Sequence, residues 1–121
     1  MVEASVSELS EALPLPVGLG ALVVFGSRRL ALARLVLAQP PLLSLHERTA
    51  AALRDCAGVP QYLLTGRWTP HVTLARGLAP AQVATALETL GQVDVLSGAI
   101  TAMRRWDGDQ RRAWLLGSPQ Q

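Results

Sequence analysis

Two neighbouring runs of the chain, residues 17–25 and 29–37, are rich in apolar and β-branched residues. A short connection that begins at Gly26 separates them, and this arrangement is typical of a β-hairpin. We therefore predict two antiparallel strands here. In the second run Arg34 shares its side of the strand with leucine and valine residues. Its guanidinium either extends to solvent at a sheet edge or reaches into a groove, where it binds an anion.

Three other segments carry apolar residues at the spacing of an amphipathic α-helix. Residues 4–13 contain Ser5 and Glu8 at the spacing of a capping box. Residues 42–55 form the second predicted helix, and residues 80–91 form the third. The packing face predicted for the third helix consists of Val83, Ala84, Leu87 and Leu90.

The end of the chain predicts a second hairpin. Residues 95–104 alternate loosely between apolar and polar, and a turn at residues 106–109 leads into the apolar run 112–116. Hairpin-joined strands interleaved with helices are typical of an α+β domain. The predicted fold class is therefore α+β, with a mostly antiparallel sheet and two or three packing helices.

The segment Trp-Thr-Pro-His-Val-Thr-Leu-Ala-Arg predicts one more strand, with a polar and an apolar side. Pro70 disfavours the helical region for the residue before it, and β-branched alternation follows. Side chains two apart in a strand share a face, so His71 and Thr73 point one way. Val72 and Leu74 point the other way. We expect a core strand whose apolar side is buried and whose polar side lines a groove.

An imidazole and a hydroxyl in one groove suit phosphodiester chemistry. Imidazole exchanges a proton near neutral pH, and a neighbouring hydroxyl can hydrogen-bond to a phosphoryl oxygen. The structural alternative is that His71 is an ordinary histidine near a strand start and that Thr73 is placed there by β-propensity.

The segment around His71 resembles the second His-x-Thr motif of the two-histidine phosphoesterase superfamily, which contains 2′-5′ RNA ligase-like proteins and cyclic nucleotide phosphodiesterases. The resemblance extends to the upstream pair of strands, to the helix around residues 45–53 and to Arg-Arg-Trp-Asp-Gly at residues 104–108. The family carries an earlier His-x-Thr on a separate strand that precedes the region matched here. We therefore expect residues 1–121 to form a single phosphoesterase-like domain that lacks this strand.

The chain has two histidines, His46 and His71. Glu47 and Arg48 follow His46, so no threonine stands two positions after it and it does not form a second motif. Because His46 falls in a predicted helix, we interpret it as a solvated or helix-packing residue rather than a catalytic one.

The resemblance implies a fold with two lobes, whose motif strands face each other across a cleft, and a mechanism without metal or cofactor. One histidine acts as general base, the other protonates the leaving oxygen, and the threonines hold phosphoryl oxygens. Carried onto this sequence, His71 is one acid/base group and Thr73 one phosphate ligand. The residues expected to bind substrate are Arg76, Arg34, Tyr62 and Trp68. Both aromatic residues could stack on a nucleobase or simply pack within the protein.

The composition indicates the size class and location of the protein and excludes some kinds of site. The 121 residues suffice for a real core, and half belong to the hydrophobic class. The absence of a long apolar run and of a secretory pattern predicts a soluble, cytoplasmic protein without a membrane partner. The single Cys56 excludes an internal disulfide and a cysteine-based zinc site. All eleven basic residues are arginine, which reflects either GC-rich coding or phosphate binding.

Three hypotheses follow from a single His-x-Thr. In the first, a homodimer completes the site in trans for 2′-5′ or 2′,3′-cyclic phosphodiesters of RNA or nucleotides, because a two-fold axis juxtaposes identical surfaces. The second is a non-catalytic protein that binds phosphate or RNA ends. In the third, the chain is a fragment of a longer enzyme.

Overall fold

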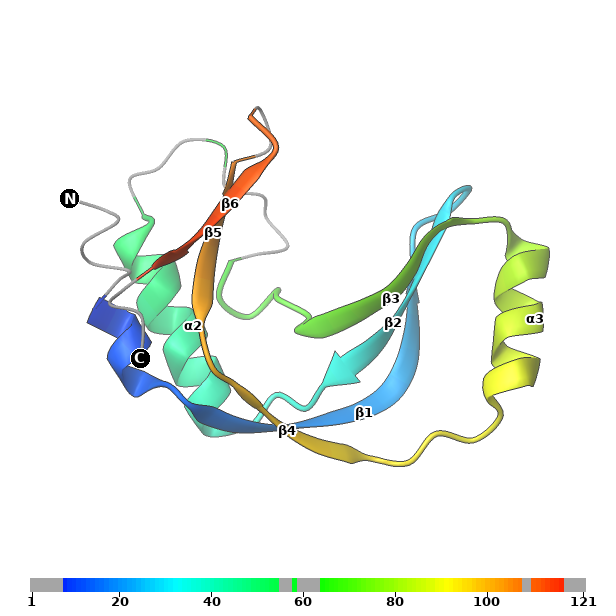
Figure 1. Ribbon diagram of the computed structural model, residues 1–121, viewed down its shortest axis with the longest axis horizontal. Helices are drawn as coiled ribbons and strands as arrows, with labels where there is room; N and C mark the ends of the chain where they lie inside the picture. The colour runs from blue at the N-terminus through cyan, green and yellow to red at the C-terminus, as the bar shows by residue number, and fades with distance from the viewer. Residues whose placement is uncertain (1–7, 55–57, 59–63, 108–109, 117–121) are drawn as a thin grey trace. The chain divides into compact units, whose positions relative to one another are not determined.

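The computed structural model describes residues 8–54, 58, 64–107 and 110–116, and Figure 1 shows the arrangement of its elements. In chain order the elements are η1 (Ser10–Ala12), β1 (Leu15–Phe25), β2 (Leu30–Val36), α2 (Pro40–Ala52), β3 (His71–Leu78), α3 (Pro80–Leu90), β4 (Leu96–Ile100), β5 (Met103–Asp107) and β6 (Arg112–Leu116).

The chain divides into two compact units. One comprises Met1–Pro16, Gln39–Trp68 and Ala99–Gln121, and the other comprises Val17–Ala38 and Thr69–Gly98. Each unit is assembled from separate stretches of the chain. The single domain expected from the sequence stays a prediction.

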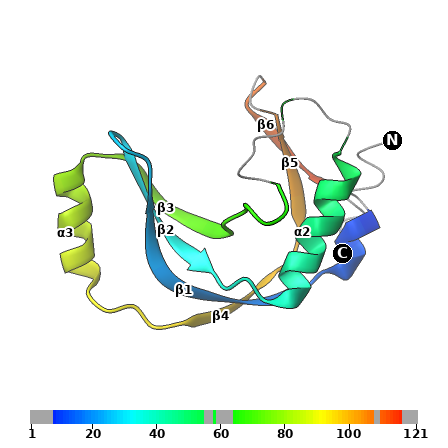
Figure 2. The same ribbon diagram turned by 180° about the vertical axis from the view of Figure 1, so that it is seen from behind.

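The second unit is built on a sheet with strand order β3-β2-β1-β4. β2 pairs antiparallel with both β1 and β3. Figures 1 and 2 show these strands curling together and α3 following β3. The α+β class with a mostly antiparallel sheet is therefore confirmed.

The first predicted hairpin is confirmed as β1 and β2, which meet where Phe25 pairs with Ala31. Gly26 begins the turn at φ 103°, a backbone conformation that favours glycine. A Cβ atom added at Gly26 would lie 2.5 Å from the carbonyl oxygen of Arg29. Arg29 also ties the turn to the end of β3, because its Nη1 donates a hydrogen bond of 2.9 Å to the carbonyl of Gly77.

β2 is the most deeply buried strand of this sheet. Ala33 is fully buried and lies opposite Thr73, whereas Arg34 lies opposite Val72. Since directly opposite residues share a face, Ala33 and Thr73 lie on one face and Arg34 and Val72 on the other.

A bulge in β1 explains the burial of Arg34. The register of β1 against β2 shifts between Leu19 and Leu22, and such a bulge bends a strand and breaks its ladder. The Arg34 guanidinium donates to the carbonyls released there, from Nε to Gly20 at 3.1 Å and from Nη2 to Leu19 and Gly20 at 3.1 and 2.9 Å. Nη2 also donates to the carbonyl of Asp94 at 2.5 Å.

The structure thus differs from both interpretations of Arg34 that the sequence offered. β2 is an interior strand, so Arg34 is not at a sheet edge, and its side chain is only 9% exposed. It lies on the face opposite to Thr73, so it does not enter a groove on the Thr73 side. A buried cation of this kind is stable because carbonyl oxygens surround it.

The prediction of a core strand with a buried apolar side is wrong for β3. This strand is the last in the sheet order, and Val72 and Leu74 are 45% and 49% exposed. Alternation identified the two faces, but it does not reveal whether a second layer covers the apolar one.

The predicted helices agree in position more than in packing. α2 begins at Pro40, two residues before the predicted start, because proline suits the first helical turn. α3 matches its prediction, yet of its expected packing face only Val83 is buried, and Leu87 and Leu90 are exposed. Residues 8–12 are helical, whereas Ser5 lies outside the described residues.

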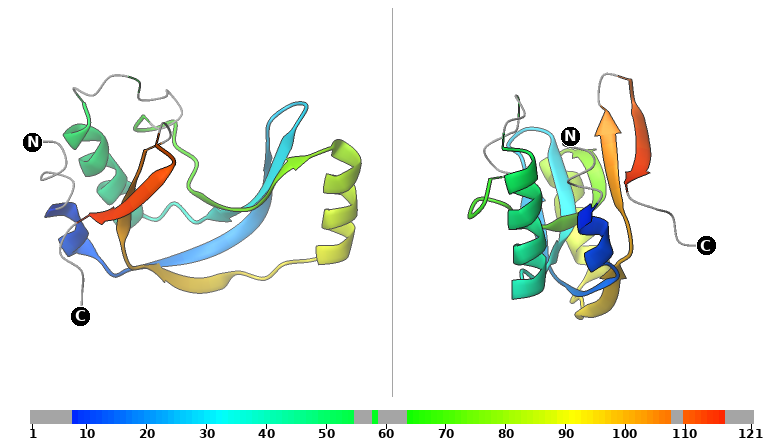
Figure 3. Two further views of the ribbon diagram at one scale, coloured as in Figure 1. Left: turned by 45° about the horizontal axis from the view of Figure 1, so that its top comes forward. Right: turned by 90° about the vertical axis from the view of Figure 1, so that its left-hand side faces the viewer.

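A C-terminal hairpin is present as β5 and β6, which pair antiparallel from Met103 opposite Leu116 to Asp107 opposite Arg112. The predicted bounds of its first strand, 95–104, are wrong: β4 belongs to the four-stranded sheet, and β5 extends to Asp107, within the predicted turn. Figure 3 shows these two strands beside each other, in the unit that also contains α2 and η1. In the part of the chain that the structure describes, no helix is long and apolar enough to cross a membrane.

We expect Arg34→Met to lower the free energy of unfolding by about 3 kcal/mol, because buried carbonyls would lose a charged donor that methionine cannot replace. Urea denaturation measures this change. The matched control is Arg29→Met, which removes one exposed hydrogen bond and should cost less than about 1 kcal/mol. Equal losses in the two variants would contradict the anchoring role of Arg34.

Gly26→Ala should destabilise the protein by about 1–3 kcal/mol, since alanine is strained at this φ and its Cβ would overlap a carbonyl oxygen. Gly98→Ala is the control, because a Cβ at Gly98 meets no heavy atom within 4 Å. Its effect should stay within about 1 kcal/mol. Thermal unfolding of both variants tests the difference, and an unchanged Gly26 variant would refute the turn geometry.

Candidate functional site

His71 and Thr73 lie on the same face of β3. His71 is opposite Leu35 and Thr73 is opposite Ala33, and both partners belong to β2. Thr73 is half-buried beside the small side chain of Ala33, whereas His71 is exposed at the start of the strand. This places an imidazole and a hydroxyl two residues apart on one surface.

Two contacts orient the His71 ring. Its Nδ1 lies 2.7 Å from the carbonyl oxygen of Thr69, and a carbonyl can only accept, so Nδ1 carries the hydrogen. Its ring centroid lies 4.6 Å from that of Phe25, with the planes tilted by 45°. With Nδ1 occupied, Nε2 is the nitrogen that exchanges a proton: it accepts one when the ring is neutral and donates one when the ring is charged.

Pro70 fixes the backbone that presents these groups. It restricts Thr69 to extended conformations, which sets the direction of the carbonyl that His71 uses. The carbonyl of Pro70 accepts the Val36 N–H at 2.9 Å, so the strand is fastened to β2 immediately before His71. Pro70 is itself buried. The order Thr-Pro-His therefore has a structural reason.

The Thr73 hydroxyl has no hydrogen-bond partner among the residues that the structure describes. It is therefore free to donate to an oxyanion. A half-buried hydroxyl beside an exposed imidazole is a suitable pair of ligands for a phosphoryl group, since one group can hold an oxygen while the other moves a proton.

A second irregularity brings Arg76 to the same face. Thr73 is opposite Ala33, but Ala75, not Leu74, is opposite Leu32, so β3 contains an extra residue here. Strict alternation would put Arg76 on the face opposite to Thr73, because the two are three residues apart. The bulge reverses this parity, and the register shifts once more between Ala75 and Leu78. Arg76, which is exposed, follows the first of these shifts, and we infer from the reversed parity that it lies on the Thr73 face.

Of the other predicted ligands, Arg34 is on the opposite face of the sheet, and Tyr62 lies outside the described residues. Trp68 belongs to the other unit, where it stacks on His46 with ring centroids 4.0 Å apart and planes 5° from parallel. His46 therefore packs within the protein, which is one of the two roles expected for it, and one face of the Trp68 indole is already covered.

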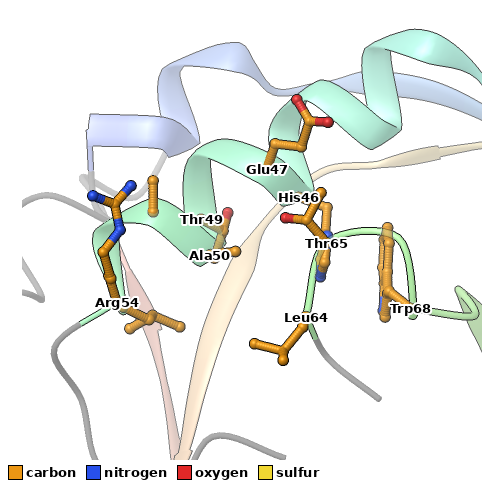
Figure 4. A pocket seen from close by; sticks show the side chains of 10 residues that line it. His46, Glu47, Thr49, Ala50, Arg54, Leu64, Thr65 and Trp68 are labelled. Carbon is orange, nitrogen blue, oxygen red and sulfur yellow. The ribbon is translucent and has the colours of Figure 1, made fainter. Parts of the chain in front are cut away.

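The stacked pair lines a cavity of about 550 Å³ in the first unit. Figure 4 shows Arg54 toward one end of it, Trp68 toward the other and Glu47 turned away from the remaining side chains. The lining residues are His46, Glu47, Thr49, Ala50, Ala51, Leu53, Arg54, Leu64, Thr65 and Trp68. The Thr49 hydroxyl is engaged, since it donates to the carbonyl of Leu45 at 2.8 Å.

Sequence reasoning missed Phe25 and the carbonyl of Thr69 as the groups that orient His71. Phe25 is far from His71 in the chain and nothing in its local pattern indicates the contact. For Thr69 a signal existed, because a proline that follows a residue fixes its carbonyl direction.

In the described part of the chain, no three histidine, cysteine, aspartate or glutamate side chains gather in a group that could hold a metal ion. The His-x-Thr motif of β3 is thus the candidate site that both the sequence and the structure support.

A search of the curated proteins finds no match, and neither does a search of the solved structures. A family model does match, however. It is described as the 2'-5' RNA ligase superfamily, and it covers residues 2–112, nearly the whole chain, including the strand that carries His71 and Thr73. This chain therefore belongs to the 2'-5' RNA ligase superfamily.

Proposed function

We propose that this protein acts on 2′-5′ or 2′,3′-cyclic phosphodiesters of RNA or nucleotides, with His71 as an acid/base group and Thr73 as a phosphate ligand. The main support is the hydrogen bond from His71 Nδ1 to the carbonyl of Thr69, because it leaves Nε2 free on the face that bears an unpartnered hydroxyl. Family membership supports the substrate class, since the superfamily is named for 2′-5′ linked RNA.

Opening of a 2′,3′-cyclic phosphate illustrates the roles. Water attacks phosphorus, its proton passes to Nε2 of neutral His71, a P–O bond to water forms and the P–O bond to one ribose oxygen breaks. The Thr73 hydroxyl donates to a non-bridging oxygen, and the Arg76 charge balances the charge that develops there. Positioned donors of this kind stabilise the transition state electrostatically, so the proposal requires no metal.

One proton transfer is left without a group among His71, Thr73 and Arg76. The ribose oxygen that leaves needs a proton, and His71 cannot accept from water and donate to this oxygen in the same step. The exposed His71 of a second copy could supply the proton, which is the reason for the homodimer predicted from the sequence.

A non-catalytic phosphate or RNA-end binder is the second candidate. It is favoured because the His-x-Thr motif of β3 supplies one imidazole, and loss of one member of an acid/base pair costs about 10²–10⁴-fold in rate. The same three side chains, His71, Thr73 and Arg76, would then hold the phosphate without turnover.

We expect His71→Ala to lower the rate of 2′,3′-cyclic nucleotide hydrolysis by at least about 100-fold, because the proton acceptor is removed. Thr73→Val keeps the side-chain shape and should lose about 10²-fold or more in kcat, as for other donors to a developing oxyanion. The pH–rate profile of the unmodified protein should be bell-shaped, with one group acting as base and another as acid.

The control is His46→Ala, which removes the other histidine and should leave hydrolysis within a few-fold. Hydrolysis that persists in His71→Ala would contradict the catalytic proposal. Salt-sensitive binding of the nucleotide without turnover, weakened in Thr73→Val, would instead establish the binder.

Arg76→Met should raise KM for the cyclic nucleotide by about 10-fold with a smaller change in kcat, because a charge that contacts the phosphate in both ground and transition states contributes uniform binding. Arg48→Met, at an exposed position of α2, is the matched control and should not change KM. Steady-state kinetics at fixed ionic strength separate the two. Equal KM values for all three proteins would exclude the role that the β3 bulge gives to Arg76.

A further inference from the structure

We infer that the outer edge of β3 is a two-fold interface with a second copy of this chain, in which His71 of each copy pairs with Thr73 of the other. The two-fold axis passes through Val72. The inference rests on the proposed function in one respect, the need for a second imidazole at the phosphodiester.

The edge is available in the structure. β3 ends the sheet order, so in the described part of the chain no strand pairs with its outer side. Three residues of this strand, His71, Val72 and Leu74, are exposed. An edge strand with free peptide groups is a template for pairing with another chain.

The direction of the peptide groups selects the residues that can pair. The carbonyl of Pro70 accepts from Val36 of β2, and Val72, two residues later, lies opposite Arg34 of the same strand. In an antiparallel ladder the peptide groups of alternate residues point to the same side, so Pro70 and Val72 direct theirs toward β2. His71 and Thr73 consequently direct their N–H and C=O groups outward.

A two-fold antiparallel pairing must match outward groups with outward groups. If the axis passes through Val72, His71 of one copy lies opposite the partner's Thr73, and both positions have outward peptide groups. Each such pair exchanges two backbone hydrogen bonds. The extra residue at Leu74 interrupts the regular ladder beyond Thr73. The paired segment is therefore short and is centred on the motif.

This register brings the two motifs to one surface. An axis perpendicular to the sheet keeps each face on its own side, so both His71 and both Thr73 side chains lie on one face and both Val72 side chains on the other. Directly opposite Cβ atoms are about 4.5–5.5 Å apart, and diagonal neighbours, here the two histidines, are about 7–8 Å apart. Two hydrogen bonds of about 2.8 Å, one on each side of a phosphoryl group, are compatible with that separation.

The dimer then supplies both the proton acceptor and the proton donor that hydrolysis of the cyclic phosphate requires. Water attacks phosphorus and gives its proton to Nε2 of the neutral His71. The charged His71 of the partner subunit gives its Nε2 proton to the ribose oxygen as the P–O bond breaks. After the step the two rings have exchanged protonation states, and one phosphodiester is held by two chains. Because a short edge buries little area, the dimer should be weak alone and strengthened by the ligand that bridges it.

The test uses Val72→Lys and Val72→Glu. Val72 is on the face away from His71 and 45% exposed, so either residue is tolerated in one chain, but two like charges would meet at the axis. Sedimentation velocity of the full chain, with and without a 2′,3′-cyclic nucleotide, should show a dimer that the nucleotide promotes. Each variant alone should be monomeric and at least 100-fold less active. An equimolar mixture should restore both the dimer and the activity, because lysine then faces glutamate.

Val24→Lys is the control, since Val24 is similarly exposed at 44% but belongs to an interior strand. It should dimerise and react as the unmodified protein does. Full activity of monomeric Val72→Lys would overturn the interface and leave the proposed function intact. A dimer that is lost in each variant and restored in the mixture, without turnover in any sample, would establish the interface and refute the catalytic function.

Discussion

The hydrogen bonds of the Arg34 guanidinium to the carbonyls of Leu19 and Gly20 are the interaction on which the second unit depends. A bulge in an interior strand releases carbonyls from the ladder, and such groups are costly when they are buried without a donor. Arg34 supplies the donor from the neighbouring strand. The bend in β1 can therefore persist inside a sheet, and the same side chain also reaches the carbonyl of Asp94 in the segment before β4.

The bent sheet in turn positions the imidazole. Phe25 pairs with Ala31 near one end of β2, and His71 pairs with Leu35 near the other, yet their rings are 4.6 Å apart. Such a contact between the first and third strands needs strong curvature and side chains that converge on the inner face. An arginine on one face of β2 thus supports the orientation of a histidine on the opposite face, without contact between the two.

The sequence predicted the elements well and their environments less well. Both hairpins and α3 were recognisable because turn residues and periodicity are local. The bulges at Leu19–Leu22 and at Leu74 were not, since a bulge is defined by the partner strand. This one omission explains two outcomes: Arg34 is buried against released carbonyls, and Arg76 shares a face with Thr73. The exposure of Val72 was unpredictable for a similar reason, because strand order decides whether an apolar face is covered.

A symmetric pair of identical histidines can still perform an asymmetric reaction. One ring must be neutral and the other charged, and this difference requires only one proton, not two different sequences. Nδ1 of each His71 donates to the carbonyl of Thr69 in either state, so the ring orientation does not change when Nε2 gains or loses its proton. In the proposed dimer, each turnover would exchange the roles of the two rings. In the proposed dimer, a single His-x-Thr motif on an edge strand would therefore be sufficient for acid/base catalysis, because two copies share the substrate.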